Sequence, residues 1–151
     1  MKITDAFRGE HGVFYAQFDA LEQRMVLDAE HAAEVNALAH MLAAALVPHA
    51  KLEDELLFSH LLDQAGPDVG PVQIMRAEHE DIEGALVQAQ AARDLGEAQQ
   101  LLLYAIERAR EHFAKEEMVL FPLAEREIDR RRLEELGEHW ANRRAVAVTS
   151  A

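Results

Sequence analysis

The sequence contains no cysteine, which excludes disulfide bonds, thiolate metal ligands and a cysteine nucleophile. Glycine (7 residues) and proline (4 residues) are scarce in the 151 residues, so regular structure is expected to have few interruptions. No apolar run approaches the length that spans a bilayer, and the N-terminus lacks the basic-then-apolar pattern of a secretory signal. We therefore expect a cytoplasmic protein that is not inserted in a membrane.

Basic residues are also few compared with acidic ones. The chain has 28 acidic and 15 basic residues, which gives a formal net charge of −13. Such a surface repels nucleic acid and anionic membranes, so neither is an expected partner. The acidic residues are scattered along the chain, as is typical of solvated helix faces that keep a protein soluble.

The residues that are abundant favour helices. Half of the sequence (50%) is hydrophobic but only 6% is aromatic, and alanine, leucine and glutamate are frequent. Apolar residues at 3-4 spacing predict four long helices, at about 4–27, 29–62, 71–93 and 96–127. Thr4 is the expected cap of the first helix, and Pro48 and Pro122 are expected to kink or bend theirs. We predict an all-α, up-down-up-down four-helix bundle in residues 1–128 and a short C-terminal helix and tail in residues 129–151.

Each long helix has an inward seam that is apolar apart from one histidine, joined in the fourth helix by Glu116. The predicted seam residues, helix by helix, are Phe7, His11, Phe14, Phe18, Leu21 and Met25; Val35, Leu38, Leu42, Ala45, His49, Leu52 and Leu56; Val72, Met75, His79, Ile82, Leu86 and Ala89; and Ala98, Leu102, Ala105, Ala109, His112, Glu116, Val119 and Leu123. In an up-down bundle, residues equidistant from a turn lie level. The proposed turns lie midway between His11 and His49, between Glu53 and His79, and between His79 and His112, which predicts that the histidines share one layer.

Three of these histidines have a glutamate four residues later: His49 with Glu53, His112 with Glu116, and His79 with Glu83. Spacing of four places both side chains on one helix face. Segments 49–58 and 112–121 also resemble each other, which suggests two helical hairpins related by a pseudo-two-fold axis.

Imidazole with carboxylate suits iron, manganese or zinc better than calcium or magnesium. A ferritin-like site needs a glutamate three residues before a histidine, and none of the eight histidines has one.

These motifs resemble the hemerythrin-like, HHE cation-binding family over about residues 5–127. The resemblance is carried by Glu10-His11-Gly12-Val13-Phe14, by the two HxxxE motifs with their trailing Leu-Phe and Leu-Phe-Pro, and by Glu78-His79-Glu80. It implies two iron ions joined by an oxo or hydroxo bridge, with manganese or zinc as substitutes. The implied ligands are His11 and His49 for one ion, His79 and His112 for the other, and Glu53 and Glu116 as bridges.

One position departs from the oxygen-carrying members of that family. They have a fifth histidine one turn after the third-helix ligand, where this chain has Glu83, so the sequence is closer to four-histidine members linked to iron handling and to nitric-oxide or oxidative-stress responses. Glu83 is a candidate ligand or outer-sphere residue, or a solvated flank. Tyr15 and Tyr104 are candidates to donate hydrogen bonds to a bound diatomic molecule.

Simpler interpretations stand beside these predictions. The four seam histidines can be independent core residues, and the two glutamates can be partners in helix salt bridges. The remaining histidines lie off the seams and are expected at the surface: His31, His40, His60 and His139. Three functions remain open, for a monomer or a homodimer. The first is a centre that binds or senses oxygen, nitric oxide or peroxide or handles iron, and the second is an enzyme that consumes peroxide or nitric oxide. The third is a metal-free or zinc-filled structural bundle that acts through contacts with other proteins.

Overall fold

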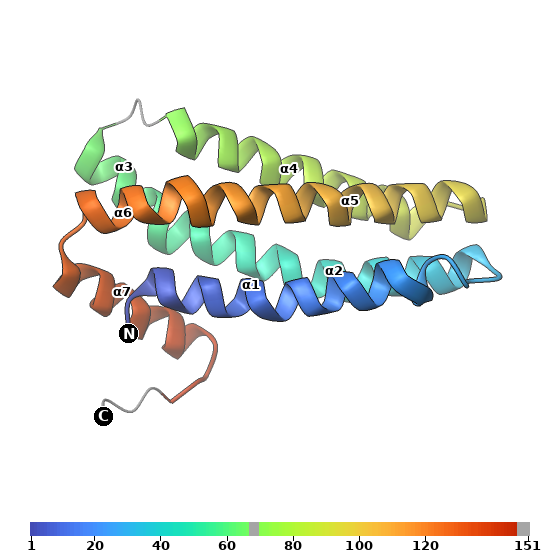
Figure 1. Ribbon diagram of the computed structural model, residues 1–151, viewed down its shortest axis with the longest axis horizontal. Coiled ribbons are helices and arrows are strands. Elements are labelled where there is room, and N and C mark those ends of the chain that lie inside the picture. The colour runs from blue at the N-terminus through green and yellow to red at the C-terminus, as the bar shows by residue number, and fades with distance from the viewer. Residues whose placement is uncertain (67–69, 148–151) are drawn as a thin grey trace.

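A computed structural model describes residues 1–66 and 70–147, and every regular element in these ranges is a helix (Figure 1). The elements are α1 (Ile3–Ala20), η1 (Leu21–Met25), α2 (Ala32–Leu52), η2 (Glu53–Phe58), α3 (Ser59–Ala65), α4 (Gly70–Ala91), α5 (Leu95–Lys115), η3 (Glu116–Leu120), α6 (Phe121–Glu127) and α7 (Arg130–Arg143), where η marks π-helical segments. The middle of the predicted loop at 63–71, residues 67–69, and the tail residues 148–151 lie outside the described part.

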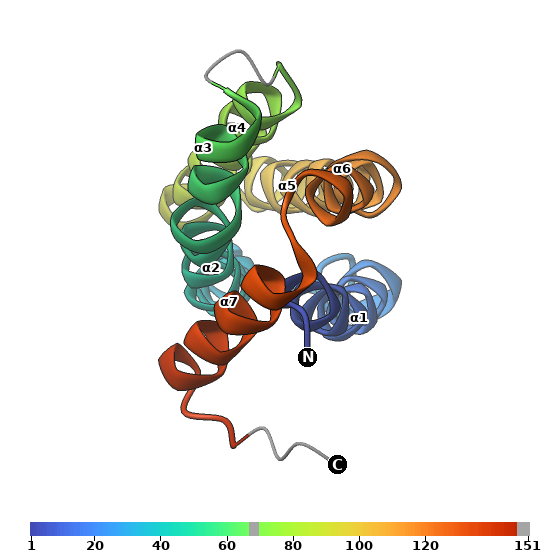
Figure 2. The same cartoon turned by 90° about the vertical axis from the view of Figure 1, so that its left-hand side faces the viewer.

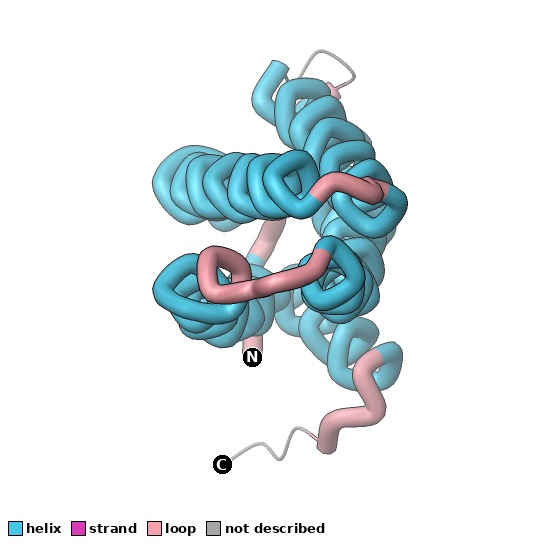
Figure 3. Tube along the Cα trace, turned by 90° about the vertical axis from the view of Figure 1, so that its right-hand side faces the viewer, coloured by secondary structure: helices cyan, strands magenta, loops and turns pink. Residues whose placement is uncertain are grey.

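The long helices form four antiparallel rods, as the up-down prediction requires. The rods are α1 with η1, α2 with η2 and α3, α4 alone, and α5 with η3 and α6 (Figures 1 and 2). Seen from either end they occupy the corners of a square, in the cyclic order α1, α2, α4, α5 (Figures 2 and 3). The prediction of an all-α bundle is confirmed. None of the described helices is both long enough and apolar enough to cross a bilayer.

The apolar core falls into two clusters, one on each side of the predicted histidine layer. One contains Phe14 and Phe18, and the other contains Phe7 and Leu57. His11 lies between Phe7 and Phe14 in α1, and the seam histidines of the other rods likewise follow residues of one cluster and precede residues of the other. A polar layer is therefore enclosed between two apolar ones.

The first helix begins earlier than predicted, and Thr4 does not cap it. The helix starts at Ile3, and Thr4 is fully buried inside its first turn. The Thr4 hydroxyl donates to Glu125 Oε1 over 2.6 Å. The hydroxyl therefore links the first and last parts of the bundle instead of satisfying an amide at the helix end, which is its role in a cap.

Aspartate caps set the starts of α5 and α7. Asp94 Oδ2 accepts from the Glu97 amide over 2.9 Å, and Asp129 Oδ1 accepts from the Arg132 amide over 3.0 Å. A side-chain oxygen in this position satisfies one of the free amides of the first turn. The second break and the fifth helix therefore fall close to their predicted places.

The π-helical segments shift the inward face by one residue, and two parts of the predicted seams are wrong as a result. Met25 and Val119 were expected in the core but are 50% and 52% exposed, whereas the next residues, Val26 and Leu120, are fully buried. Each π-helical segment adds a residue to a turn, so a seam counted at 3.6 residues per turn falls one position behind. The shift persists beyond η3, where Ala124 is fully buried in place of Leu123.

Helix α7 crosses the end of the bundle where the N-terminus lies (Figure 2). Its buried side chains include Leu133 and Leu136, which belong to the same apolar cluster as Phe7. Gly137 comes so close to the start of the chain that a Cβ atom there would lie 2.2 Å from the Met1 carbonyl oxygen. Glycine therefore permits the close approach of α7 to the bundle.

Candidate metal centre

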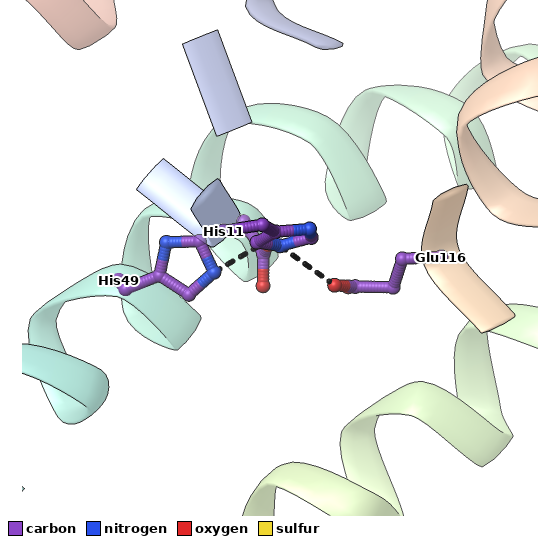
Figure 4. Close-up of side chains that lie close together, drawn as sticks. His11, His49 and Glu116 are labelled. Atoms are coloured by element: carbon purple, nitrogen blue, oxygen red, sulfur yellow. Dashed lines mark ion pairs between the residues drawn. The ribbon is translucent and has the colours of Figure 1, made fainter. Parts of the chain in front are cut away.

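The six predicted ligands converge in the layer between the two apolar clusters. His11 comes from α1, His49 from α2, and Glu116 from the first position of η3, and their side chains point toward one another (Figure 4). The other three are Glu53, at the first position of η2, His79 of α4 and His112 of α5. All are buried, at most 1% exposed, except His79, whose side chain is 9% exposed.

The Glu53 carboxylate faces histidines on two sides. Its Oε1 atom lies 3.1 Å from His49 Nε2 and 3.5 Å from His11 Nε2. Its Oε2 atom lies 3.3 Å from His79 Nε2. One carboxylate thus offers one oxygen to each of two histidine groups.

The Glu116 carboxylate divides its oxygens in the same way. Its Oε2 atom lies 3.3 Å from His11 Nε2, and its Oε1 atom lies 3.3 Å from His112 Nε2. Two groups result, each with two histidines and both glutamates, and within each group the ligand atoms lie within 4.8 Å of one another. We call them the His11–His49 site and the His79–His112 site.

The atoms that face these two sites have no other partner in the described part of the chain. They are the Nε2 atoms of the four histidines and all four carboxylate oxygens of Glu53 and Glu116, eight atoms in all. Buried polar atoms are rarely left without a hydrogen bond, because each such atom costs about 1–3 kcal/mol. Two nitrogens and two oxygens per site match the ligand preferences of iron, manganese or zinc. The residues therefore fit two metal ions.

Four further carboxylates, which we did not predict from the sequence, each contact the Nδ1 atom of one imidazole. This atom is on the other side of the ring from the Nε2 atom that faces the sites. The Nδ1 atom of each histidine lies close to one carboxylate oxygen, at 2.9 Å for His11 and Glu117, 2.5 Å for His49 and Glu10, 3.4 Å for His79 and Asp54, and 3.0 Å for His112 and Glu78. An Nδ1–H that donates to a carboxylate leaves the Nε2 lone pair free for a metal ion. All four rings are thus oriented for metal binding.

These outer carboxylates form a closed ring around the square. The outer carboxylate of each rod contacts the histidine of the next rod, in the order α1 to α2, α2 to α4, α4 to α5 and α5 back to α1. Each outer carboxylate is also the sequence neighbour of a ligand, as in Glu10-His11, Glu53-Asp54, Glu78-His79 and Glu116-Glu117. This adjacency is the signal that could have identified them.

Cationic side chains neutralise three of the outer carboxylates. Arg76 donates to Asp54 over 3.1 Å, and Lys115 pairs with Glu78. Glu10 accepts hydrogen bonds from Arg144 and from the indole of Trp140, which both lie in the C-terminal part of the chain. Such partners keep a carboxylate ionised and in place, which in turn fixes the histidine that it holds.

Neighbouring carboxylates raise the pKa values of His11, His49 and His79 in the metal-free protein. Burial alone would lower the pKa of His11, but the Glu116 and Glu53 carboxylates outweigh burial and raise it to about 10. The same balance of burial against carboxylates raises the pKa of His79 to about 10 and that of His49 to about 9. Burial raises the pKa of Glu53, yet the charge of His49 holds it well below its usual value. Metal ions must displace these protons, so metal affinity should increase with pH.

Glu53 and Glu116 each lie at the first position of a π-helical segment. Glu53 opens η2, whose carbonyl at Asp54 accepts from the Ser59 hydroxyl over 2.7 Å. Glu116 opens η3, which ends at Leu120, two residues before Pro122, a residue that has no amide hydrogen to offer an α-helix. The irregularity expected at Pro122 therefore takes the form of a π turn at the site, where such turns often occur. Helix α2 continues through Pro48 without a break.

A cavity of about 30 Å³ borders three of the four histidines: His49, His79 and His112. Among the described residues, Glu83 is the one acidic residue that lines it, and apart from the three histidines the other lining residues are apolar. His11 does not line the cavity, since its ring stacks on Phe113 at a centroid distance of 3.9 Å. The cavity has room for roughly one or two water-sized molecules.

The two tyrosine candidates lie elsewhere. Tyr104 is 43% exposed, and its hydroxyl donates to Asp81 over 2.8 Å, so the structure does not bring it to the site. Tyr15 is half-buried with its ring edge-on to Phe113, and burial followed by the nearby Glu117 charge raises its pKa. Tyr15 thus adjoins the outer carboxylate of His11 and does not line the cavity.

Most histidines outside the seams are at the surface. His31, His40 and His139 are exposed, as expected. His60 differs, because it is half-buried and its Nε2 atom accepts from Arg132 Nη2 over 2.5 Å. It therefore connects α3 to α7 and does not join the metal-binding layer.

The fold and the site define a helical bundle with a buried histidine and glutamate cluster that can hold metal ions. The family model of the hemerythrin HHE cation-binding domain matches residues 2–124, and the chain belongs to that family. The match confirms the family resemblance and ends before α7 begins at Arg130. No curated protein and no solved structure matches the chain.

Proposed function

We propose that the protein is a cytoplasmic, non-haem di-iron protein whose centre binds or senses oxygen, nitric oxide or peroxide, or handles iron. The observation that carries the proposal is the division into two sites of eight buried ligand atoms that make no hydrogen bond in the described part of the chain. A single ion would use only one of these sites. Two ions use both, and they account for each glutamate presenting one oxygen to either side.

The ligand count suits a reactive centre if the metal is iron. Each site offers four ligand atoms, which would fill a tetrahedral zinc ion but would leave positions for an external ligand on an iron ion of higher coordination number. When bound, non-haem iron supplies one-electron chemistry with oxygen and related small molecules. The imidazoles would bind the ions, and the carboxylates would offset their charge in a buried layer.

The cavity limits what can reach the centre. It touches histidines of both sites, it holds only a molecule of a few atoms, and its walls are mostly apolar. Phe113 lines the cavity and also stacks on the His11 ring. A small, uncharged or weakly polar ligand, such as a diatomic gas or hydrogen peroxide, matches the size and the mostly apolar walls of this cavity.

Glu83 favours a second candidate function, an enzyme that consumes peroxide or nitric oxide. Its side chain is exposed to solvent and also lines the cavity. A carboxyl group in that position can exchange protons with water and deliver them to a ligand in the cavity, which is the requirement for general acid catalysis. Binding and sensing need no such delivery.

Anaerobic loading with ferrous iron tests the proposal. We expect two irons per folded chain, and a near-ultraviolet absorption band on exposure to oxygen, nitric oxide or peroxide. Reversible changes support binding or sensing, whereas rapid turnover that Glu83→Gln slows supports the enzyme. Glu80→Gln is the matched control, because Glu80 is exposed on the same helix but does not line the cavity. One iron or less per folded chain, or preferential filling with zinc, would contradict the di-iron proposal.

A further inference from the structure

We propose that α7, which lies outside the family match, is a positioning element for one of the two metal ions, the one in the His11–His49 site. Arg144 and Trp140 would hold Glu10, and Glu10 would hold the His49 ring in its metal-binding orientation. The inference rests on the two-metal function proposed above.

The contacts run in an unbroken line from the C-terminal part of the chain to the site. Arg144 Nε donates to Glu10 Oε1 over 2.6 Å, and Trp140 Nε1 donates to the same oxygen over 3.2 Å. The other oxygen, Glu10 Oε2, accepts from His49 Nδ1 over 2.5 Å. His49 Nε2 then faces the metal site, 3.1 Å from Glu53 Oε1. With both oxygens engaged, the Glu10 carboxylate has one orientation available, and so has the ring that it holds.

The two halves of the bundle show why α7 is needed in one of them only. Glu10 holds His49 as Glu78 holds His112, and Glu78 is neutralised from within the bundle by Lys115. In the matching HxxxE segments, the counterpart of Lys115 is Leu52, which is 4% exposed and carries no charge. The first hairpin thus lacks the cation that the second supplies for itself. Arg144 provides that charge for Glu10.

Helix α7 is fixed independently of the site, so it can act as a support. Leu133 and Leu136 are buried in the core, and Gly137 sits against the Met1 carbonyl. Arg143, the neighbour of Arg144, pairs with Glu55 over 3.0 Å and touches none of the six ligands. Trp140 lies on this docked helix and Arg144 is its C-terminal cap, so both side chains lose little further freedom when they bond to Glu10, which makes them effective at orienting it.

The inference predicts that the two ions leave the protein at different rates when α7 is altered. Removing an outer-sphere partner typically lowers metal affinity by about 10- to 100-fold. Arg144→Gln should therefore accelerate the release of one iron by about tenfold or more and leave the other unchanged. Trp140→Phe keeps the ring packing but removes the N–H donor, so it should act in the same direction more weakly.

Loss of ferrous iron from anaerobically loaded full-length protein into excess chelator measures these rates. Arg144→Lys should restore slow release, because it returns the charge next to Glu10. Arg143→Gln removes an equal charge from the same helix and should release iron as the wild type does. Lys115→Gln should accelerate the other iron, and the double variant with Arg144→Gln should accelerate both. Circular dichroism of each metal-free variant checks that the fold is retained.

Several outcomes would overturn the inference. Arg144→Gln releasing both irons at wild-type rates would show that α7 does not support the site. Equal acceleration of both irons, or an equal effect of Arg143→Gln, would show that α7 stabilises the bundle as a whole. A wild-type protein that fails to take up two irons would instead contradict the proposed function, which keeps the two failures distinct.

Discussion

Replacing Glu53 by glutamine in the metal-free protein should produce a large loss of stability that depends on pH. Glu53 is fully buried and lies 3.1–3.5 Å from ring nitrogens of His11, His49 and His79. Removing one partner of a buried ion pair costs about 3–5 kcal/mol, because the remaining charge has no compensation. We expect a loss of that size in the free energy of unfolding at about pH 6.

The sign of the pH dependence follows from the histidine pKa values. They rise from an ordinary value of 6.5 to about 9 for His49 and about 10 for His11 and His79. The stabilisation they share with Glu53 is therefore complete below pH 6.5 and is lost as the pH rises through about 9 to 10. The pKa of Glu53 itself is depressed, so its contribution is present above 4.5 and disappears only as the pH falls further.

Urea unfolding of the metal-free protein at about pH 6 and about pH 10.5 tests this reasoning. At the higher pH the penalty for Glu53→Gln should shrink to about 1 kcal/mol, the contribution of ordinary hydrogen bonds. Glu55→Gln is the control, since that side chain is 40% exposed and its pair with Arg143 should be worth about 0–1 kcal/mol at either pH. An equal loss at both pH values for Glu53→Gln would refute the buried ion-pair account.

Three further outcomes are expected. Ferrous iron should bind more tightly as the pH rises from about 6.5 to about 9 and should release protons on binding, which a pH-stat titration measures; an affinity independent of pH would contradict the protonated state of the free site. Phe113→Ala should lower the free energy of unfolding by about 3–5 kcal/mol, because the ring is 1% exposed and stacks on His11; urea unfolding should show less than half of this loss for Phe113→Leu. Tyr104→Phe should change stability by less than about 1 kcal/mol and leave the iron content unaltered, because the lost hydroxyl contact with Asp81 is at the surface; reduced iron content would restore this tyrosine as a site candidate.

The sequence was sufficient for the bundle and for the composition of the metal-binding layer. One histidine in each apolar seam and two HxxxE motifs specify which side chains face inward, because residues four apart share a helix face. The positions of the turns specify that the histidines lie level. The structure brings together all six residues that this periodicity selects.

Periodicity failed where the helix ceases to be regular. Met25 and Val119 were placed in the core by counting 3.6 residues per turn, but the π-helical segments η1 and η3 rotate the chain by one residue and leave them exposed. A π turn depends on local bonding around residues such as Pro122 and on how neighbouring rods pack. Neither dependence is visible in an apolar pattern.

Contacts between distant parts of the chain were settled only by the tertiary structure. Arg144 and Glu10 are 134 positions apart and meet because α7 docks against the first rod, while Tyr104, which lies on a rod that does supply a ligand, turns to solvent. Spacing along one helix fixes which face a residue occupies, since the helix geometry is constant. Which side chain on another helix it meets depends on the rotation and docking of both elements, and that is a property of the folded chain.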